Sequence, residues 1–224
     1  MNNSRVAILK QSARYSLMLL FWIPVIFFSL LLVRNTVPYF SFAKDFSFIQ
    51  ERALLFAKPA YNFCFYAHVG AGMFCVSSAL LQLSTSIIRR RSFIHVWSGR
   101  IYVFVVMMIG APTGLYMAFF AKGGYAEHGL FVFMAIYWFF ATMKGLQTIL
   151  AKKVLAHKIW MIRSYCMAMT AVSFRLYHMA FFAAGWGHLE NYEISLWISV
   201  LGNILVAELV IWRMSKNYLA SFHS

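Results

Sequence analysis

The feature that most limits the possible folds is a series of long apolar segments separated by short polar stretches. A helix needs about 20 mostly apolar residues to cross a bilayer, and its backbone groups must then bond within the segment. Charged residues make up only 12% of the chain, about half the share typical of soluble domains. The sequence therefore predicts an all-α, multi-pass membrane protein with a single membrane domain over residues 1–224. The six expected transmembrane helices are 16–33, 61–83, 101–121, 129–150, 164–186 and 194–212.

The positive charges between these segments predict their orientation. With the N-terminus inside, most lysines and arginines fall on the cytoplasmic side, as is typical of membrane proteins. The expected outer side receives only Arg34, Lys44, Arg52, Lys58 and Lys122. We therefore expect both termini in the cytoplasm, a location in the cell (inner) membrane, and a basic face toward anionic lipid headgroups. This distribution accounts for the net charge of +14, so nucleic acid is not an expected partner.

The first apolar run and the loop after it carry two further expectations. The run from Leu17 to Val33 is longer than a signal-peptide core of about 7–15 residues, so we expect it to remain as the first span. The outer loop covers residues 34–60, and within it the stretch 48–56 is expected to form a short helix on the membrane surface. Nothing in this loop indicates catalysis.

Ionisable residues inside the expected spans are candidate site residues, because such groups are costly in lipid. His68 and His178 lie at similar expected depths on different spans, as a bis-histidine haem requires; His128 is an alternative partner for His68. The other interpretation is helix packing with two hydrogen-bonded imidazoles. Arg175, near mid-membrane, needs a partner such as a haem propionate, a quinone oxygen or a helix carbonyl. Glu208 is expected to pair with a nearby arginine. The candidates for that partner are Arg163, Arg100 and Arg213.

Two expected cytoplasmic loops repeat one arrangement of residues. His95 precedes Trp97 and Arg100, and His157 precedes Trp160 and Arg163. Tryptophan is typical of the membrane interface, so both histidines should lie at equal depth where spans three and five begin. The sequence thus predicts an inner pair, His95 with His157. If the fifth span is one straight helix, His157 and Arg175 also share a face, because 18 residues make five turns.

These loops carry a resemblance to a known family. The motifs are R-x-x-x-H-x-x-x-G-R-x-Y from Arg91 to Tyr102 and H-x-x-W-M-I-R-S-Y at 157–165, with Gly114–Leu115 and 121–124 between them. Over residues 60–220 the chain resembles an uncharacterised bacterial family of predicted multi-pass membrane proteins. The resemblance implies a fold and a set of important positions, but no activity. Those positions are His68, Gln82, Arg91, His95, Arg100, His157, Arg163 and Arg175.

The arrangement is also similar to the six-helix, two-haem transmembrane cytochromes b that use ascorbate. In those proteins the ligands come from helices two to five in alternating pairs. His68 with His128, and His95 with His157, would reproduce that alternation. The likeness concerns the fold alone.

Two functional hypotheses follow. One is a cofactor-free carrier, assembly factor or lipid-contacting module with a His/Arg cluster at its cytoplasmic edge. The other is a b-type haem oxidoreductase that moves electrons across the membrane, with a quinone or another small redox molecule as partner. Its axial ligands would come from His68, His95, His157 and His178, and Arg175, Arg100, Arg163 and Gln82 would line the cofactor sites. The sequence has no dinucleotide-binding fingerprint, hydrolase motif or zinc motif, and it leaves open whether the protein is an enzyme.

Overall fold

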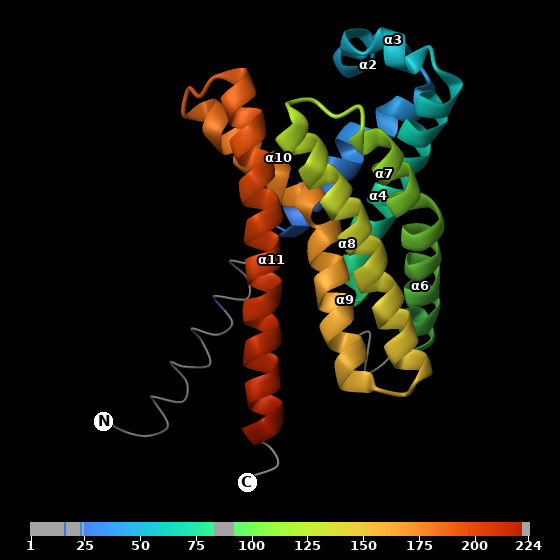
Figure 1. Cartoon of the computed structure of the whole chain (residues 1–224), viewed down its shortest axis with the longest axis vertical. Coiled ribbons are helices and arrows are strands. Elements are labelled where there is room, and N and C mark those ends of the chain that lie inside the picture. The colour runs from blue at the N-terminus through green and yellow to red at the C-terminus, as the bar shows by residue number, and fades with distance from the viewer. Residues whose placement is uncertain (1–15, 17–22, 24, 83–91, 221–224) are drawn as a thin grey trace.

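The chain is described here from a computed structural model that places residues 25–82 and 92–220, together with residues 16 and 23 (Figure 1). These described residues are helical over most of their length and contain no strand, as the sequence predicts. Residues 25–36 form the first described helix. The labelled elements follow in this order: η1 (Val37–Ser41), α2 (Ser47–Glu51), α3 (Ala53–Phe56), α4 (Pro59–Gln82), α6 (Ser92–Val105), η2 (Val106–Gly110), α7 (Ala111–Ala118), α8 (Tyr125–Leu150), α9 (Val154–Ala168), α10 (Thr170–Ala183) and α11 (His188–Ala220).

Three helical segments of the described chain are long and apolar enough to cross a bilayer. They are Phe93–Ala118, Tyr125–Leu150 and His188–Tyr218, which correspond to the third, fourth and sixth expected spans. Helix α4 matches the second expected span, 61–83, to within two residues. The first expected span is helical from residue 25 onward, and most of its earlier part lies outside the described residues.

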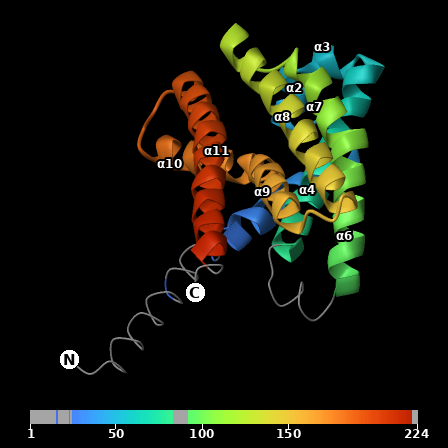
Figure 2. The same ribbon diagram turned by 60° about the horizontal axis from the view of Figure 1, so that its bottom comes forward.

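Helices α4, α6, α8 and α9 form one packed bundle, with η2 and α7 extending α6. Its core joins small residues of α4 to aromatic and aliphatic residues of the other helices. The buried members are Cys75, Ala79, Tyr102, Val106, Met161, Tyr165 and Ala168. Helices α8 and α9 form a hairpin so close that a Cβ on Gly145 would lie 2.6 Å from Sδ of Met161. Helix α10 leaves this bundle and packs on α11 (Figure 2).

The helices extend beyond the expected spans at several ends. Helix α6 begins at Ser92, so His95 and Arg100 lie within a helix and not in the expected loop before residue 101. The residues from Phe93 to Trp97 are mostly apolar and include neither glycine nor proline, so nothing interrupts the helix there. Helix α11 likewise exceeds the expected span 194–212 at both ends.

The candidate span Phe93–Ala118 contains one wide π turn, η2, between α6 and α7. Pro112 lies at the start of α7. A proline has no N–H to donate, and its ring clashes with the carbonyl four residues earlier, which here belongs to Met108. The backbone therefore widens just before the proline. Single π turns of this kind are frequent at functional sites.

The expected fifth span, 164–186, is not one helix. Helix α9 ends at Ala168, Met169 adopts a turn conformation, and α10 begins at Thr170. At this break Asn203 of α11 donates from Nδ2 to the Cys166 carbonyl at 3.0 Å and to the Ser173 hydroxyl at 3.0 Å. Polar side chains that take over backbone groups in this way interrupt helices. The condition under which His157 and Arg175 would share one face, a single helix through both residues, is therefore not met.

The expected short helix at 48–56 is present as two, α2 and α3. Arg52 lies between them and donates to the Phe120 carbonyl at 2.5 Å and to the Tyr61 hydroxyl at 3.3 Å. Lys122 forms an ion pair with Glu51. These contacts attach the segment 47–56 to the end of α7 and the turn that follows it.

Candidate functional site

The starts of α6 and α9 and the ends of α8 and α11 lie at the same end of the molecule, at the bottom of Figure 1. We call this the basic end, because it carries a group of described lysines and arginines. They are Arg100, Lys144, Lys152, Lys153, Lys158, Arg163, Arg213 and Lys216. Arg91, which belongs to the same motif as Arg100, lies outside the described residues.

The basic end contains the inner histidine pair. His95 and His157 are each the fourth residue of their helix, α6 and α9, and their imidazoles lie within electrostatic range of each other. His157 donates from Nδ1 to the Gly145 carbonyl at 2.8 Å. Since a carbonyl only accepts, Nδ1 carries the proton and Nε2 keeps a lone pair. Nδ1 of His95 is buried with no hydrogen-bond partner among the described residues.

Gln82, at the end of α4, fixes the start of α6. Its Nε2 donates to the His95 carbonyl at 2.8 Å and to the Ser98 hydroxyl at 2.5 Å. Gly99 packs beside this amide, and a Cβ there would lie 3.5 Å from Nε2 of Gln82, in ordinary van der Waals contact. Gln82 is therefore a buried side chain that positions the backbone around His95, and it has the structural role of a helix tether.

The two arginines of the repeated pattern adopt the same local geometry. The guanidinium of Arg100 lies 5.2 Å from the ring centre of Trp97, and that of Arg163 lies 4.6 Å from the ring centre of Trp160. Arg163 also makes a two-point ion pair with Glu208 of α11, Nε to Oε1 at 2.7 Å and a terminal nitrogen to Oε2 at 3.0 Å. The expected pairing of Glu208 with an arginine is confirmed, and Arg163 is the partner.

Cation–π contacts recur at this end on two more helices. Lys144 lies over the ring of Phe140 on α8, and Lys216 lies over that of Trp212 on α11, both at 5.5 Å. In such contacts a charged group gains from the ring face while its aliphatic stem covers apolar surface. Helices α6, α8, α9 and α11 thus each present a cation held over an aromatic ring at the basic end.

The outer histidines are not brought together as a haem pair. His68 donates from Nδ1 to the Gly110 carbonyl of η2 at 2.9 Å. The His178 ring instead stacks on Phe174 and contacts His188 edge to face, with centroids 5.6 and 6.1 Å apart. His128 uses Nε2 in a 3.0 Å hydrogen bond to the Ala121 carbonyl. His68 and His178 thus contact different helices. In His128 the nitrogen that most often ligates iron, Nε2, is already hydrogen-bonded to a backbone carbonyl.

Of the partners expected for Arg175, the structure shows a helix carbonyl. A terminal nitrogen of its guanidinium donates to the Ala171 carbonyl of its own helix at 2.7 Å, and it interacts electrostatically with Tyr39 of η1. No acidic side chain of the described chain forms an ion pair with it. Its position, on α10, is remote from the inner histidines.

The sequence did not predict a hydrogen-bonded network in the centre of the bundle. The Tyr102 hydroxyl lies 2.8 Å from that of Ser164 and accepts from Trp138 Nε1 at 3.1 Å. Ser164 in turn bonds Thr142 at 2.7 Å. The ring of Tyr165 packs on Tyr102, with centroids 4.4 Å apart, yet its buried hydroxyl has no partner among the described residues. Tyr102, Ser164 and Tyr165 are motif residues, so much of the motif specifies this core.

Comparison with known proteins gives one match. The model of a family described as a predicted membrane protein (DUF2306) matches residues 65–211. This range begins within α4 and includes most of the bundle and most of α11. It contains His68, His95, His128, His157 and His178. No curated protein and no solved structure matches the chain.

Proposed function

Because the chain belongs to the DUF2306 family of predicted membrane proteins, we propose that it is a multi-pass membrane protein whose basic end binds anionic phospholipid headgroups. In this proposal the chain crosses the cell membrane six times, with the basic end and both termini in the cytoplasm. The excess of lysine and arginine at that end supports this orientation.

The observation that carries the proposal is the set of four cation–π pairs on four different helices at one end. An aromatic ring at the membrane interface, with a cation above it, places positive charge at headgroup depth. Basic groups near an anionic membrane surface contribute about 1 kcal/mol each to binding. Groups of this kind on different helices can contact several headgroups at once.

The charges at this end also differ in what they contact. Arg163 is engaged by Glu208, whereas Arg100, Lys144 and Lys216 have no acidic side chain within ion-pair distance in the described residues. Arg163 therefore serves to join α9 to α11. Arg100, Lys144 and Lys216 are the groups that we expect to bind phosphate oxygens.

The test is lipid selectivity. The protein is reconstituted in mixed vesicles of phosphatidylcholine and phosphatidylglycerol, and the co-purifying lipid is counted by native mass spectrometry. We expect phosphatidylglycerol to be enriched, and enrichment to fall in the double variant Arg100→Gln, Lys144→Gln. The control variant Arg34→Gln, at an exposed position on the expected outer side, should keep it. Retention of both lipids in their bulk ratio by the unmodified protein would contradict the proposal.

The second candidate function is haem-dependent electron transfer through the inner pair. One observation favours it. Nδ1 of His157 is bonded to a backbone carbonyl, which is the contact that orients metal-ligating histidines and leaves Nε2 for the metal. The absorbance spectrum of protein purified from haem-replete cells tests it: sharp reduced bands that disappear in His157→Ala would support it, and a colourless protein would reject it.

A further inference from the structure

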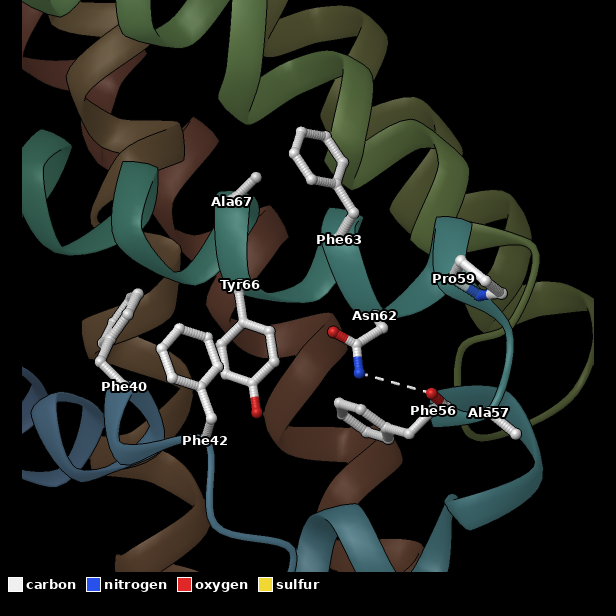
Figure 3. Close-up of a pocket in the computed structure, with 9 residues that line it drawn as sticks. All are labelled: Phe40, Phe42, Phe56, Ala57, Pro59, Asn62, Phe63, Tyr66 and Ala67. Atoms are coloured by element: carbon white, nitrogen blue, oxygen red, sulfur yellow. Dashed lines mark hydrogen bonds between the residues drawn. The ribbon is translucent and has the colours of Figure 1, made fainter.

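An open groove of about 700 Å³ lies at the opposite end of the molecule from the basic end, between the N-terminal segments and α4 (Figure 3). Its lining is almost entirely aromatic and aliphatic. The lining residues are Phe40, Phe42, Phe56, Ala57, Pro59, Asn62, Phe63, Tyr66 and Ala67. Seven of these nine precede the region that matches the family model, residues 65–211. The groove is thus an addition to the bundle that this match covers.

One wall of the groove depends on an unfavourable backbone conformation. Phe42 ends η1 with φ 57°, in the left-handed region, and its N–H donates to the Tyr39 carbonyl at 3.0 Å. A bulky residue rarely adopts this conformation, which costs about 1–2 kcal/mol. It places the Phe42 ring 4.8 Å from that of Tyr66. Strain of this kind persists only where surrounding contacts hold it, and it gathers at ligand sites.

The opposite wall of the groove is formed by Phe56, whose ring is fixed by packing on other aromatic rings. Phe56 packs edge to face on Phe65 and Tyr61, with centroids 4.9 and 5.4 Å apart. Asn62 donates to the Phe56 carbonyl at 3.4 Å, which joins α3 to the first turns of α4. The groove is therefore formed before any ligand enters, and pre-formed apolar pockets of this volume are typical of small-molecule sites.

We propose that this groove holds one acyl chain of a phospholipid from the leaflet opposite the basic end. The lining offers almost no hydrogen-bonding group, so it suits hydrocarbon. Phe42, which follows η1, and Phe63, near the start of α4, are 63% and 70% exposed, and in the six-span arrangement they lie at the outer edge of the second span. Lys44 and Lys58, both exposed, adjoin the lining segments in the chain and complement the phosphate of a headgroup near the water interface.

The experiment uses the full-length protein in vesicles that contain phosphatidylcholine with a photoactivatable diazirine on one acyl chain. After irradiation, labelled positions are mapped by peptide mass spectrometry. We expect the label to concentrate on residues 40–67 and to exceed that at Phe133, an exposed ring of α8. The variant Ala67→Trp fills the groove, and the matched control Ala180→Trp adds the same ring at an exposed position of α10.

Labelling of residues 40–67 should fall about tenfold in Ala67→Trp, equivalent to a loss of roughly 1.4 kcal/mol of binding free energy, and stay unchanged in Ala180→Trp. An unchanged melting temperature in both variants shows that the fold is kept. Uniform labelling along all helices, or unchanged labelling in Ala67→Trp, would overturn the proposal. So would cross-linking of two chains in the variant Phe63→Cys, because a second copy would then occupy the groove. The zwitterionic probe makes this result independent of headgroup selectivity at the basic end.

Discussion

Gly114 of α7 and His68 of α4 pack so closely that a Cβ on Gly114 would lie 2.8 Å from Cε1 of His68. The imidazole therefore lies against the α7 backbone, where Nδ1 donates to the Gly110 carbonyl and lies 3.3 Å from the Thr113 hydroxyl. His68 thus joins α4 to the π turn η2.

The first prediction follows from this contact. Gly114→Ala should destabilise the protein by about 1–3 kcal/mol, the usual cost of overpacking, because the His68 ring must move and its hydrogen bond to Gly110 must lengthen. The measurement is thermal unfolding in detergent. Gly72→Ala is the control, since a Cβ there meets nothing within 4 Å, and it should be neutral or stabilising by up to about 1 kcal/mol. Equal effects at both glycines would contradict the packing.

The second prediction compares two adjacent buried tyrosines. Tyr102→Phe removes a hydroxyl that is bonded to Ser164 and Trp138, and it should cost about 1–3 kcal/mol by leaving those groups unpaired. Tyr165→Phe removes a buried hydroxyl with no partner among the described residues. It should be neutral or stabilising. Denaturant unfolding of both variants, followed by tryptophan fluorescence, measures the difference, and a larger loss in Tyr165→Phe would be evidence against this network.

The third prediction concerns the ion pair between α9 and α11. Arg163 and Glu208 are 21% and 44% exposed, so solvent screens their attraction. Glu208→Gln should therefore cost only about 1 kcal/mol, and it should free Arg163 to bind phosphate. Melting temperature and phosphatidylglycerol retention together measure both effects. Glu190→Gln, at an exposed position at the start of α11, should change neither. Loss of lipid selectivity in Glu208→Gln would be inconsistent with the role given to the pair.

The fourth prediction is a pH dependence at the other end of the molecule. The hydrogen bond from Lys122 lowers the pKa of Glu51. A carboxyl whose pKa is lower in the folded state stabilises the contact above its unfolded pKa, about 4.3 for glutamate, and this stabilisation is lost as the pH falls through the folded value. Limited proteolysis at residues 47–56 should therefore rise in acid. Glu51→Gln should show the raised cleavage at neutral pH and little further change with acid; a variant that still follows the wild-type pH curve would refute this.

The fifth prediction tests the proposed orientation. A reporter enzyme that is active only outside the cytoplasm should work when fused after Lys44, Lys122 or Glu190, and it should fail after Arg90 or Lys153. The reason is the distribution of lysine and arginine between the loops. The reverse pattern at two or more sites would overturn the six-span arrangement with both termini inside.

Helix content and the long spans could be predicted from the sequence because they depend on the length and composition of each segment. Tyr125–Leu150 and His188–Tyr218 lie where apolar runs exceed the bilayer requirement. The interruption at Met169 could not be predicted in this way. It depends on Asn203, which is more than thirty residues away in the chain and reaches the break only through the packing of α11.

The site was predicted in part. The repeated histidine, tryptophan and arginine pattern does mark one end of the bundle, whereas the pairing of His95 with His157 stays a prediction. No contact among the described residues supports the pairing of His68 with His178, which stays a prediction: His68 faces η2, and His178 faces α11. Matched depth alone does not fix the direction of a side chain. The central network was missed because tyrosine, serine and threonine in apolar segments carry no periodic signal.

The amide of Asn203 also determines how α11 can move. Nδ2 satisfies acceptors on both sides of the break between α9 and α10. Sliding α11 by one residue rise would move Nδ2 away from its acceptors. If the helix also turned by one residue, Gly202 or Ile204 would reach this point, and neither has a side-chain donor to replace the amide. The position of α11 along its own axis, relative to the break between α9 and α10, is therefore fixed to within one residue rise, about 1.5 Å. If α11 moves, the break between α9 and α10 must move with it, so α11 and this break move together.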